Sequence, residues 1–152
     1  MNKKEPIIRF ANKSDIKEIV RLCALHADYE KSEYNSENKE QNLIQYLFSE
    51  NPSSFCLVAE LDNNIIGYSS YMKQFSTWDT DFYIYMDCLF LTEESRGYGI
   101  GEKMMNVIKL EAKKLNCSLI QWQTPNFNTR AIKFYNRIGG ISKTKERYFL
   151  KV

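Results

Sequence analysis

Apolar residues recur along the chain at two spacings, every second residue and every three to four, which are typical of strands and helices respectively. Alternating or continuous apolar runs predict strands at residues 7–10, 55–60, 65–71, 82–91, 118–123 and 147–151. Helical spacing predicts helices at about residues 12–26, 41–48, 99–115 and 129–138. This order of strands and helices indicates a single mixed α/β domain of the α+β type.

Short polar signals predict where several of these elements begin and end. Asn12-Lys13-Ser14-Asp15 is typical of a helix start in which Asn12 caps the first turn and Asp15 bonds back to the cap. Asp62-Asn63-Asn64 predicts the turn of a β-hairpin. Gly139-Gly140 predicts the end of the last helix. Residues 28–38 are polar and acidic, and we expect them to form a loop.

The stretch Arg96-Gly97-Tyr98-Gly99-Ile100-Gly101 lies between a predicted strand and a predicted helix. At such a junction, free backbone N–H groups and the positive end of the helix dipole favour a bound anion. The glycines let the backbone approach a ligand closely, and Arg96 adds a cation suited to phosphate. This stretch therefore predicts a phosphate-binding turn.

Two common nucleotide motifs do not fit this turn. A Walker A loop needs Lys and then Ser or Thr after its last glycine, whereas Gly101 is followed by Glu102-Lys103-Met104. A dinucleotide fingerprint, G-x-G-x-x-G, fails in either register, because position 102 is Glu and position 104 is Met. The spacing that remains is R-x-x-G-x-G.

Composition indicates an ordinary globular chain. Of the 152 residues, 43% are hydrophobic and 14% aromatic, which is enough for one core and favours a single domain over residues 1–152. The net charge of +2 is too small to indicate nucleic acid as a partner. No apolar stretch has the length of a signal sequence or a membrane span, so we expect a soluble, cytoplasmic protein.

The cysteines and the one histidine do not form a recognisable site in the sequence. Cys23, Cys56, Cys88 and Cys117 are scattered, without a C-x-x-C pair, and we expect reduced core residues. With a single histidine, His26, the chain lacks the ligands of a structural zinc site, and we predict no metal. We interpret His26 as a residue on a helix surface rather than as the partner of a nucleophilic cysteine.

A second motif follows the fifth predicted strand. Asn128 to Gly139 reads N-x-x-A-x-x-F-Y-x-x-x-G, and together with the earlier R-x-x-G-x-G it resembles the GNAT acetyltransferases in order and spacing. The strand and helix at residues 7–25 match the opening of that family, so the resemblance spans the chain. It implies a central, mostly antiparallel mixed sheet that splays between strands four and five, helices on both faces, and acetyl-CoA as the cofactor.

Softer features resemble the diamine (spermidine/spermine) and thialysine acetyltransferases. They are Asp28-Tyr29-Glu30, the aromatic-rich segment from Phe75 to Tyr83 that leads into the fourth strand, and the C-terminal Tyr148-Phe149-Leu150-Lys151. This resemblance implies a small-molecule amine acceptor, such as a polyamine, a thialysine-like amino acid or an amine antibiotic, and a homodimer. A protein N-terminal or lysine acetyltransferase and a non-catalytic acyl-CoA-binding module remain as alternatives.

The resemblance also implies which residues bind the cofactor. Backbone groups at the end of the fourth strand should pair with the pantetheine arm as an added strand would. N–H groups of the glycine turn should hold the pyrophosphate, and the second motif should border the cofactor from the far side. The expected cofactor-binding residues are Leu89, Phe90, Leu91, Arg96, Gly97, Tyr98, Gly99, Ile100, Gly101, Asn128, Ala131 and Phe134.

The chemistry implied by the resemblance is direct attack of a neutral amine on the thioester, which needs no protein nucleophile. Tyr135 matches the general acid that protonates the departing CoA thiolate. The N–H group of Leu89 is expected to stabilise the oxyanion. Asp87 stands where the diamine enzymes have a glutamate and is expected to bind the amine or act as a base through water. The other expected substrate contacts are Tyr29, Glu30 and Trp122.

Overall fold

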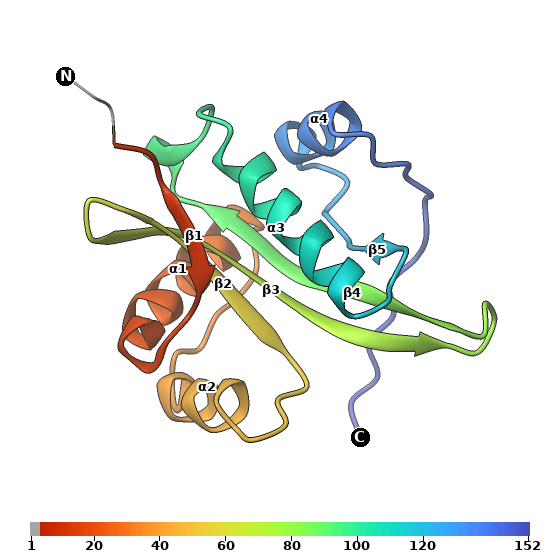
Figure 1. Ribbon diagram of the computed structural model, residues 1–152, viewed down its shortest axis with the longest axis horizontal. Helices are drawn as coiled ribbons and strands as arrows, with labels where there is room; N and C mark the ends of the chain where they lie inside the picture. Colours follow the sequence, from red (N-terminus) through yellow and green to blue (C-terminus); the bar gives the residue numbers. More distant parts are fainter. Residues whose placement is uncertain (1–3) are drawn as a thin grey trace.

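The computed structural model describes residues 4–152 and contains one five-stranded sheet with the strand order β1-β2-β3-β4-β5. Neighbouring strands are antiparallel from β1 to β4, and β5 is parallel to β4. Figure 1 shows the hairpin of β3 and β4 extending past the other strands. The strands are β1 (Ile7–Phe10), β2 (Phe55–Leu61), β3 (Asn64–Ser76), β4 (Asp81–Leu91) and β5 (Ile120–Gln121).

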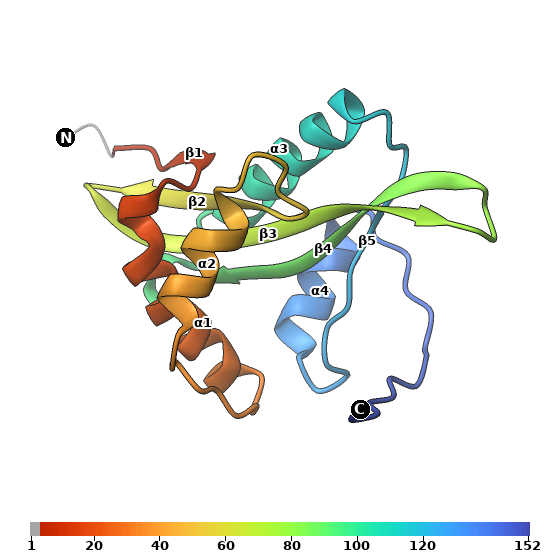
Figure 2. The same cartoon turned by 90° about the horizontal axis from the view of Figure 1, so that it is seen from below.

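Helices cover both faces of the sheet, as predicted, with α3 on one side and α1 and α2 on the other (Figure 2). One core packs Met104 and Ile108 of α3 against Tyr71, and the other packs Ile19 and Leu22 of α1 under the opposite face. The α-helices are α1 (Ile16–Tyr29), α2 (Lys39–Leu47), α3 (Ile100–Lys114) and α4 (Thr129–Arg137). Within residues 4–152, none of them is long and apolar enough to cross a membrane.

The predicted capping box at the start of the first helical segment is confirmed. The Asn12 side chain accepts a hydrogen bond from the Ser14 N–H, and the Asp15 carboxylate accepts one from the Asn12 N–H. Arg9 donates two further bonds to Asp15, at 2.7 and 2.9 Å, and lowers the pKa of that carboxyl. The cap begins a short 3-10 helix, Lys13–Asp15, that leads directly into α1.

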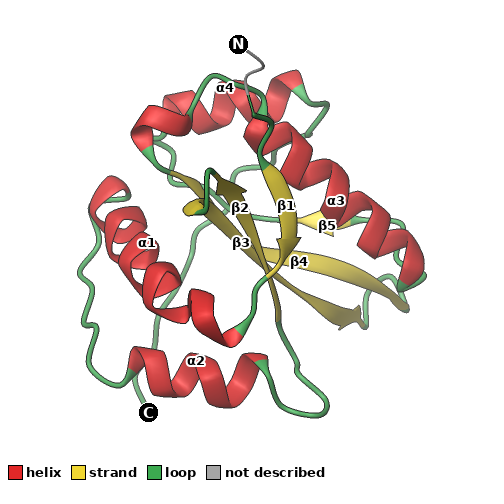
Figure 3. Ribbon diagram, turned by 60° about the vertical axis from the view of Figure 1, so that its left-hand side comes forward, coloured by secondary structure: helices red, strands yellow, loops and turns green. Residues whose placement is uncertain are grey.

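Four predicted elements differ from the structure. Strand β3 continues to Ser76, five residues past the end predicted at residue 71. Helix α1 continues to Tyr29, so the start of the predicted 28–38 loop is helical. Strand β5 is a two-residue strand, not six, beside β4 (Figure 3). Residues 147–151 form no strand, because no strand of the described residues lies beside them, and a segment without a partner cannot satisfy a strand's main-chain groups.

Strand β4 contains a β-bulge at Asp87. Cys88 pairs with Ser70 and Met86 pairs with Tyr71, so Asp87 is an extra residue in the ladder. Strands β4 and β5 pair only at Ile84↔Ile120 and Tyr85↔Gln121, after which the two strands separate. The splay between strands four and five is therefore confirmed, and the second half of β4 has an open edge.

Candidate active site

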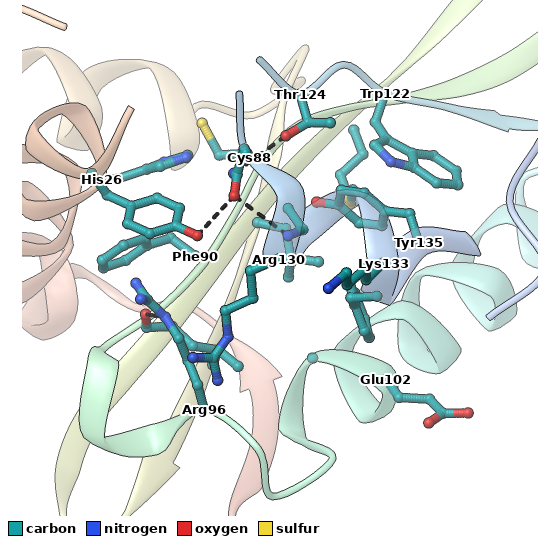
Figure 4. A pocket seen from close by; sticks show the side chains of 18 of the residues that line it. His26, Cys88, Phe90, Arg96, Glu102, Trp122, Thr124, Arg130, Lys133 and Tyr135 are labelled. Atoms are coloured by element: carbon teal, nitrogen blue, oxygen red, sulfur yellow. Dashed lines mark hydrogen bonds between the residues drawn. The ribbon is translucent and has the colours of Figure 1, made fainter. Parts of the chain in front are cut away.

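A cavity of about 510 Å³ opens at the free edge of β4 (Figure 4). The end of α1, the second half of β4, the glycine turn with the start of α3, and the segment 122–137 surround it. Among the sequence-predicted site residues only Tyr98 does not line it, and its side chain is exposed. Those that do line it are Tyr29, Glu30, Asp87, Leu89, Phe90, Leu91, Arg96, Gly97, Gly99, Ile100, Gly101, Trp122, Asn128, Ala131, Phe134 and Tyr135.

The open edge of β4 offers main-chain hydrogen-bonding groups to the cavity. In an antiparallel ladder, residues that exchange bonds with the partner strand alternate with residues that do not. The Thr92 N–H donates to the Ile66 carbonyl at 2.9 Å, so the alternation turns the main-chain groups of Leu89 and Leu91 away from β3. The Leu91 carbonyl accepts a bond from Arg96 Nε at 3.0 Å. An extended ligand with amide groups can therefore add along this edge.

The glycine turn has the backbone that the sequence indicated. Gly97 and Gly99 have φ angles of +86° and +76°, where a β-carbon is strained, and Gly99 directly precedes α3. The Lys103 N–H donates to the Gly99 carbonyl, so the N–H groups between these residues have no helical acceptor and suit phosphate oxygens. Gly101 serves packing instead, because a β-carbon there would lie 3.2 Å from the Phe134 ring.

Basic side chains that the sequence interpretation missed also line the cavity. These are Arg130 and Lys133 of α4 (Figure 4) and Arg137 of the same helix, and they add to the predicted Arg96. Their spacing of three and four residues places them on one face of α4, and this spacing in the second motif is the signal that could have found them. A group of cations around one cavity suits a ligand that carries several phosphate charges.

Tyr135 lies in an aromatic wall of the cavity. Its ring centre is 5.1 Å from that of Trp122 and 5.2 Å from that of Phe134. Burial, and then the negative charge of Glu30, raise the pKa of the Tyr135 hydroxyl well above its ordinary value of 10. The hydroxyl therefore keeps its proton. The Glu30 carboxylate is close enough for its charge to affect the hydroxyl.

Tyr29 and Asn128 form a bridge between α1 and α4. The Tyr29 hydroxyl donates to Asn128 Oδ1 at 2.8 Å, and the same oxygen caps α4 by accepting from the Ala131 N–H. Asn128 Nδ2 donates to Thr124 Oγ1 at 3.3 Å. The Arg96 guanidinium lies 4.4 Å from the centre of the Tyr29 ring. These contacts hold the two walls of the cavity together.

Asp87 and Cys88 lie at the bulge where β4 becomes an open edge. The Asp87 side chain is exposed and its Oδ2 lies 3.7 Å from the Cys88 sulfur. Burial, and then the charge of Asp87, raise the pKa of the Cys88 thiol to about 12. Because the thiolate is the reactive form of cysteine, Cys88 is a poor acyl acceptor at neutral pH.

The interpretation of His26 as a residue on a helix surface is wrong. Its side chain is only 14% exposed and lines the cavity. It contacts Tyr68 and Glu30 through its two ring nitrogens. The sequence spacing could have shown this. His26 follows Leu22 and Cys23 by four and three residues, so it lies on the same inward face of α1.

The chain is similar to known acetyltransferases in sequence and fold. Residues 19–140 match the model of the acetyltransferase (GNAT) family. A thialysine N-epsilon-acetyltransferase of Sus scrofa is 31% identical over 147 residues, which are 91% of this chain and 86% of that protein.

Two solved structures superpose on nearly the whole chain. An integron cassette protein of V. cholerae is 27% identical, with a TM-score of 0.76 over 98% of this chain and 94% of that one. An aminoglycoside N-acetyltransferase in complex with CoA is 14% identical, with a TM-score of 0.80 over 97% of this chain and 95% of that one. The second likeness shows the fold alone.

The cavity fits the cofactor of that family. Its open strand edge matches a ligand arm with amide groups, and its glycine turn and basic residues match phosphates. The family match extends over most of the sequence. The chain therefore belongs to the acetyltransferase (GNAT) family and is an acetyl-CoA-dependent N-acetyltransferase.

Proposed function

We propose that this enzyme acetylates a primary amine of a small molecule, such as a polyamine, a thialysine-like amino acid or an amine antibiotic. The observation that carries the proposal is that Glu30 and Asp87 line the same cavity as the protonated hydroxyl of Tyr135. Two carboxylates suit a cationic acceptor, because each can bind an ammonium group. The similarity to a thialysine acetyltransferase supports the same class of acceptor.

In this proposal the main chain and the basic residues of the cavity hold the cofactor. The Leu89 carbonyl and the Leu91 N–H bind the pantetheine arm, because Arg96 already donates to the Leu91 carbonyl. The turn from Arg96 to Gly101 binds the pyrophosphate through its N–H groups, and the cations of α4 add further phosphate contacts. Bound acetyl-CoA supplies the acetyl group as a thioester. The Leu89 N–H then donates to the thioester oxygen as negative charge develops on it.

Two side chains, Asp87 and Tyr135, accept and donate the protons of the acetyl transfer. The amine nitrogen forms a bond to the acetyl carbon while the carbon–sulfur bond breaks. The ammonium form of the acceptor first releases one proton to solvent, and Asp87, directly or through water, takes a second proton as the carbon–nitrogen bond forms. Tyr135 donates the proton of its hydroxyl to the departing sulfur and regains one from solvent. The products are the acetylated amine and CoA.

The proposal is tested by CoA release over a panel of acceptors: spermidine, thialysine, an aminoglycoside and a lysine-containing peptide. We expect turnover with at least one of the small amines. Activity on the peptide alone would replace the small-molecule acceptor by a protein acceptor.

Asp87→Asn is expected to raise the KM for the amine by about tenfold, because it removes a charge-assisted contact to the ammonium group. The KM for acetyl-CoA should stay within about twofold of the wild-type value, since the phosphate-binding parts of the cavity are unchanged. Steady-state kinetics with each substrate varied in turn measures both constants. Asp79→Asn, in the turn between β3 and β4, is the control and should match the wild type. An unchanged amine KM in Asp87→Asn would remove Asp87 from the acceptor site.

We also propose that the enzyme is a cytoplasmic homodimer. Its four cysteines are free thiols, as in a reducing compartment. Large apolar side chains are exposed on the β3–β4 hairpin, where Trp78 is 94% exposed, and on the tail, where Phe149 and Leu150 are 80% and 92% exposed. Exposed apolar side chains of this size favour association, and a second copy would cover them.

The double substitution Phe149→Ser and Leu150→Ser is expected to convert the dimer into monomers, because it removes apolar area from the proposed interface. Light scattering coupled to size exclusion measures the mass of each form. Lys143→Ser and Lys145→Ser, polar changes in the same tail, are the control and should leave the dimer intact. A wild-type protein that elutes with the mass of one chain would contradict the dimer.

A further inference from the structure

We propose that His26 is a positioning residue for the acceptor amine: it holds the Glu30 carboxylate at the cavity wall, and when His26 gains a proton the cavity binds a cationic acceptor less tightly. This inference rests on the proposed small-molecule amine acceptor. It adds to that function a residue that sets how strongly the acceptor binds as pH changes.

The imidazole of His26 is held on three sides. Its Nδ1 lies 2.7 Å from the Tyr68 hydroxyl, and its Nε2 lies 3.1 Å from Glu30 Oε1. The ring stacks on Phe90, with ring centres 5.1 Å apart and an interplanar angle of 21°. Rotation of the ring would break both polar contacts, so Glu30 has a fixed partner. The contact to His26 uses one carboxylate oxygen, Oε1, and the other can bind an ammonium group.

Glu30 faces the space in which the reaction takes place. The charge of Glu30 is the second cause, after burial, of the raised pKa of Tyr135, so the carboxylate and that hydroxyl interact across the cavity. Both side chains line the same cavity. An acceptor whose ammonium group is bound by Glu30 can extend a second amine within the same cavity toward Tyr135. The acceptor class that suits this arrangement carries two amino groups.

His26 can gain a proton without losing a hydrogen bond. Burial raises the pKa of Tyr68 far above its ordinary value, so its hydroxyl keeps one hydrogen. In the neutral state, Tyr68 donates to Nδ1, and Nε2–H donates to Glu30. In the charged state both nitrogens donate, and Tyr68 turns its own hydrogen toward the sulfur of Cys23 or Cys88, with which it also interacts. His26 can thus become charged while its ring keeps the same position.

Charged groups of both signs surround His26. The titratable or charged groups around the His26–Tyr68 pair are Tyr29, Glu30 and Cys23 of α1, Lys39 of α2, Tyr68 of β3, Asp87 and Cys88 of β4, and Arg96. The two thiols are neutral because burial raises their pKa values, and Tyr68 is neutral as well. An imidazolium adds one positive charge beside the Glu30 carboxylate. The added charge weakens the attraction of this wall for an ammonium group.

The test uses the fact that His26 is the single histidine of the sequence. In protein without a histidine tag, the imidazole NMR signals therefore belong to His26 without assignment. We would titrate these signals with CoA alone and with CoA plus saturating thialysine, whose amino groups stay charged between pH 6 and 8. Calorimetry on the same samples gives the Kd for thialysine. Spermidine replaces thialysine if thialysine does not bind.

We expect the bound amine to move the titration midpoint of His26 to lower pH. By linkage, the Kd for the amine should rise as pH falls from 8 to 6, and a midpoint shift of about 0.7 pH unit corresponds to a roughly fivefold rise once the pH lies below both midpoints. Glu30→Gln should abolish the midpoint shift. His26→Gln keeps a donor for Glu30 and cannot become charged, so its amine Kd should be the same at both pH values. CoA binding to each variant confirms that its cavity is folded.

The outcomes separate this inference from the proposed function. Turnover of small amines, together with a His26 midpoint that the amine does not move, would overturn the inference and leave the proposed function intact. The same rise in Kd between pH 8 and pH 6 in His26→Gln as in the wild type would also overturn it. If no small amine is bound or turned over by the wild type, both fall.

Discussion

Tyr135→Phe is expected to lower kcat by roughly 100- to 10,000-fold, which is the range that a positioned proton donor contributes. The substitution removes only the hydroxyl and keeps the ring that packs against Trp122 and Phe134. The KM for acetyl-CoA should therefore stay within about twofold of the wild-type value. Steady-state release of CoA, followed with a thiol reagent, measures both constants.

The pKa of Tyr135 adds a pH profile to this prediction. Burial and the charge of Glu30 raise that pKa above its ordinary value of 10, so the proton is retained to higher pH than in an exposed tyrosine. The kcat of the wild type should accordingly show no descending limb as pH rises to about 10. Tyr46→Phe, at an exposed position on α2, is the control and should match the wild type. If Tyr135→Phe keeps a kcat within threefold of wild type, Tyr135 is not the proton donor.

Gly99→Val is expected to weaken CoA binding by roughly 100-fold, which corresponds to about 2.7 kcal/mol. Its φ of +76° is a conformation that a β-branched residue resists, so the turn must change shape. That change displaces the N–H groups at the start of α3 from the position in which we propose that they bind phosphate. Calorimetric titration of the folded variant with CoA gives the Kd directly.

Gly139→Val provides a matched control for backbone strain. Gly139 has a φ of +94°, and it follows α4 without lining the cavity. The substitution should lower the melting temperature through the same kind of strain and leave the CoA Kd within about threefold of the wild-type value. Equal losses of CoA affinity in the two variants would mean that the glycine turn acts through stability and not through contact with phosphate.

The parts of the fold that depend on local pattern could be predicted from the sequence. The apolar spacing of Met104, Met105 and Ile108 predicted α3, and these side chains form the core under the sheet. The cap at Asn12 and the positive φ angles in the glycine turn follow equally from residue type. Local pattern also identified the two motifs that border the cavity.

The parts that depend on long-range pairing could not be predicted. Residues 147–151 have strand-forming side chains, but a strand needs a neighbouring edge, and pattern alone does not supply one. The bulge at Asp87 lies in a continuous apolar run, so alternation gives no sign of it. The bulge nevertheless changes which face of the sheet the following side chains point to. Met86 and Leu89 pack in the α3 core, and Cys88 packs in the α1 core.

The site was predicted less completely than the fold. Motif positions identified most of the predicted residues that line the cavity, yet the contact of His26 joins it to Tyr68, which is 42 positions away in the sequence. The bridge between Tyr29 and Asn128 spans 99 positions. Contacts of this kind come from the arrangement of α1 and α4 on either side of the open strand edge, which a single sequence does not contain.

The central claim is that a small amine attacks bound acetyl-CoA directly in this cavity. Initial rates of CoA release, with acetyl-CoA and the most active small amine both varied, test it most directly. Direct attack requires both substrates on the enzyme together, so the double-reciprocal lines should intersect. Parallel lines would indicate an acetyl-enzyme intermediate, and no turnover with any small amine would remove the proposed acceptor; either result would contradict the account.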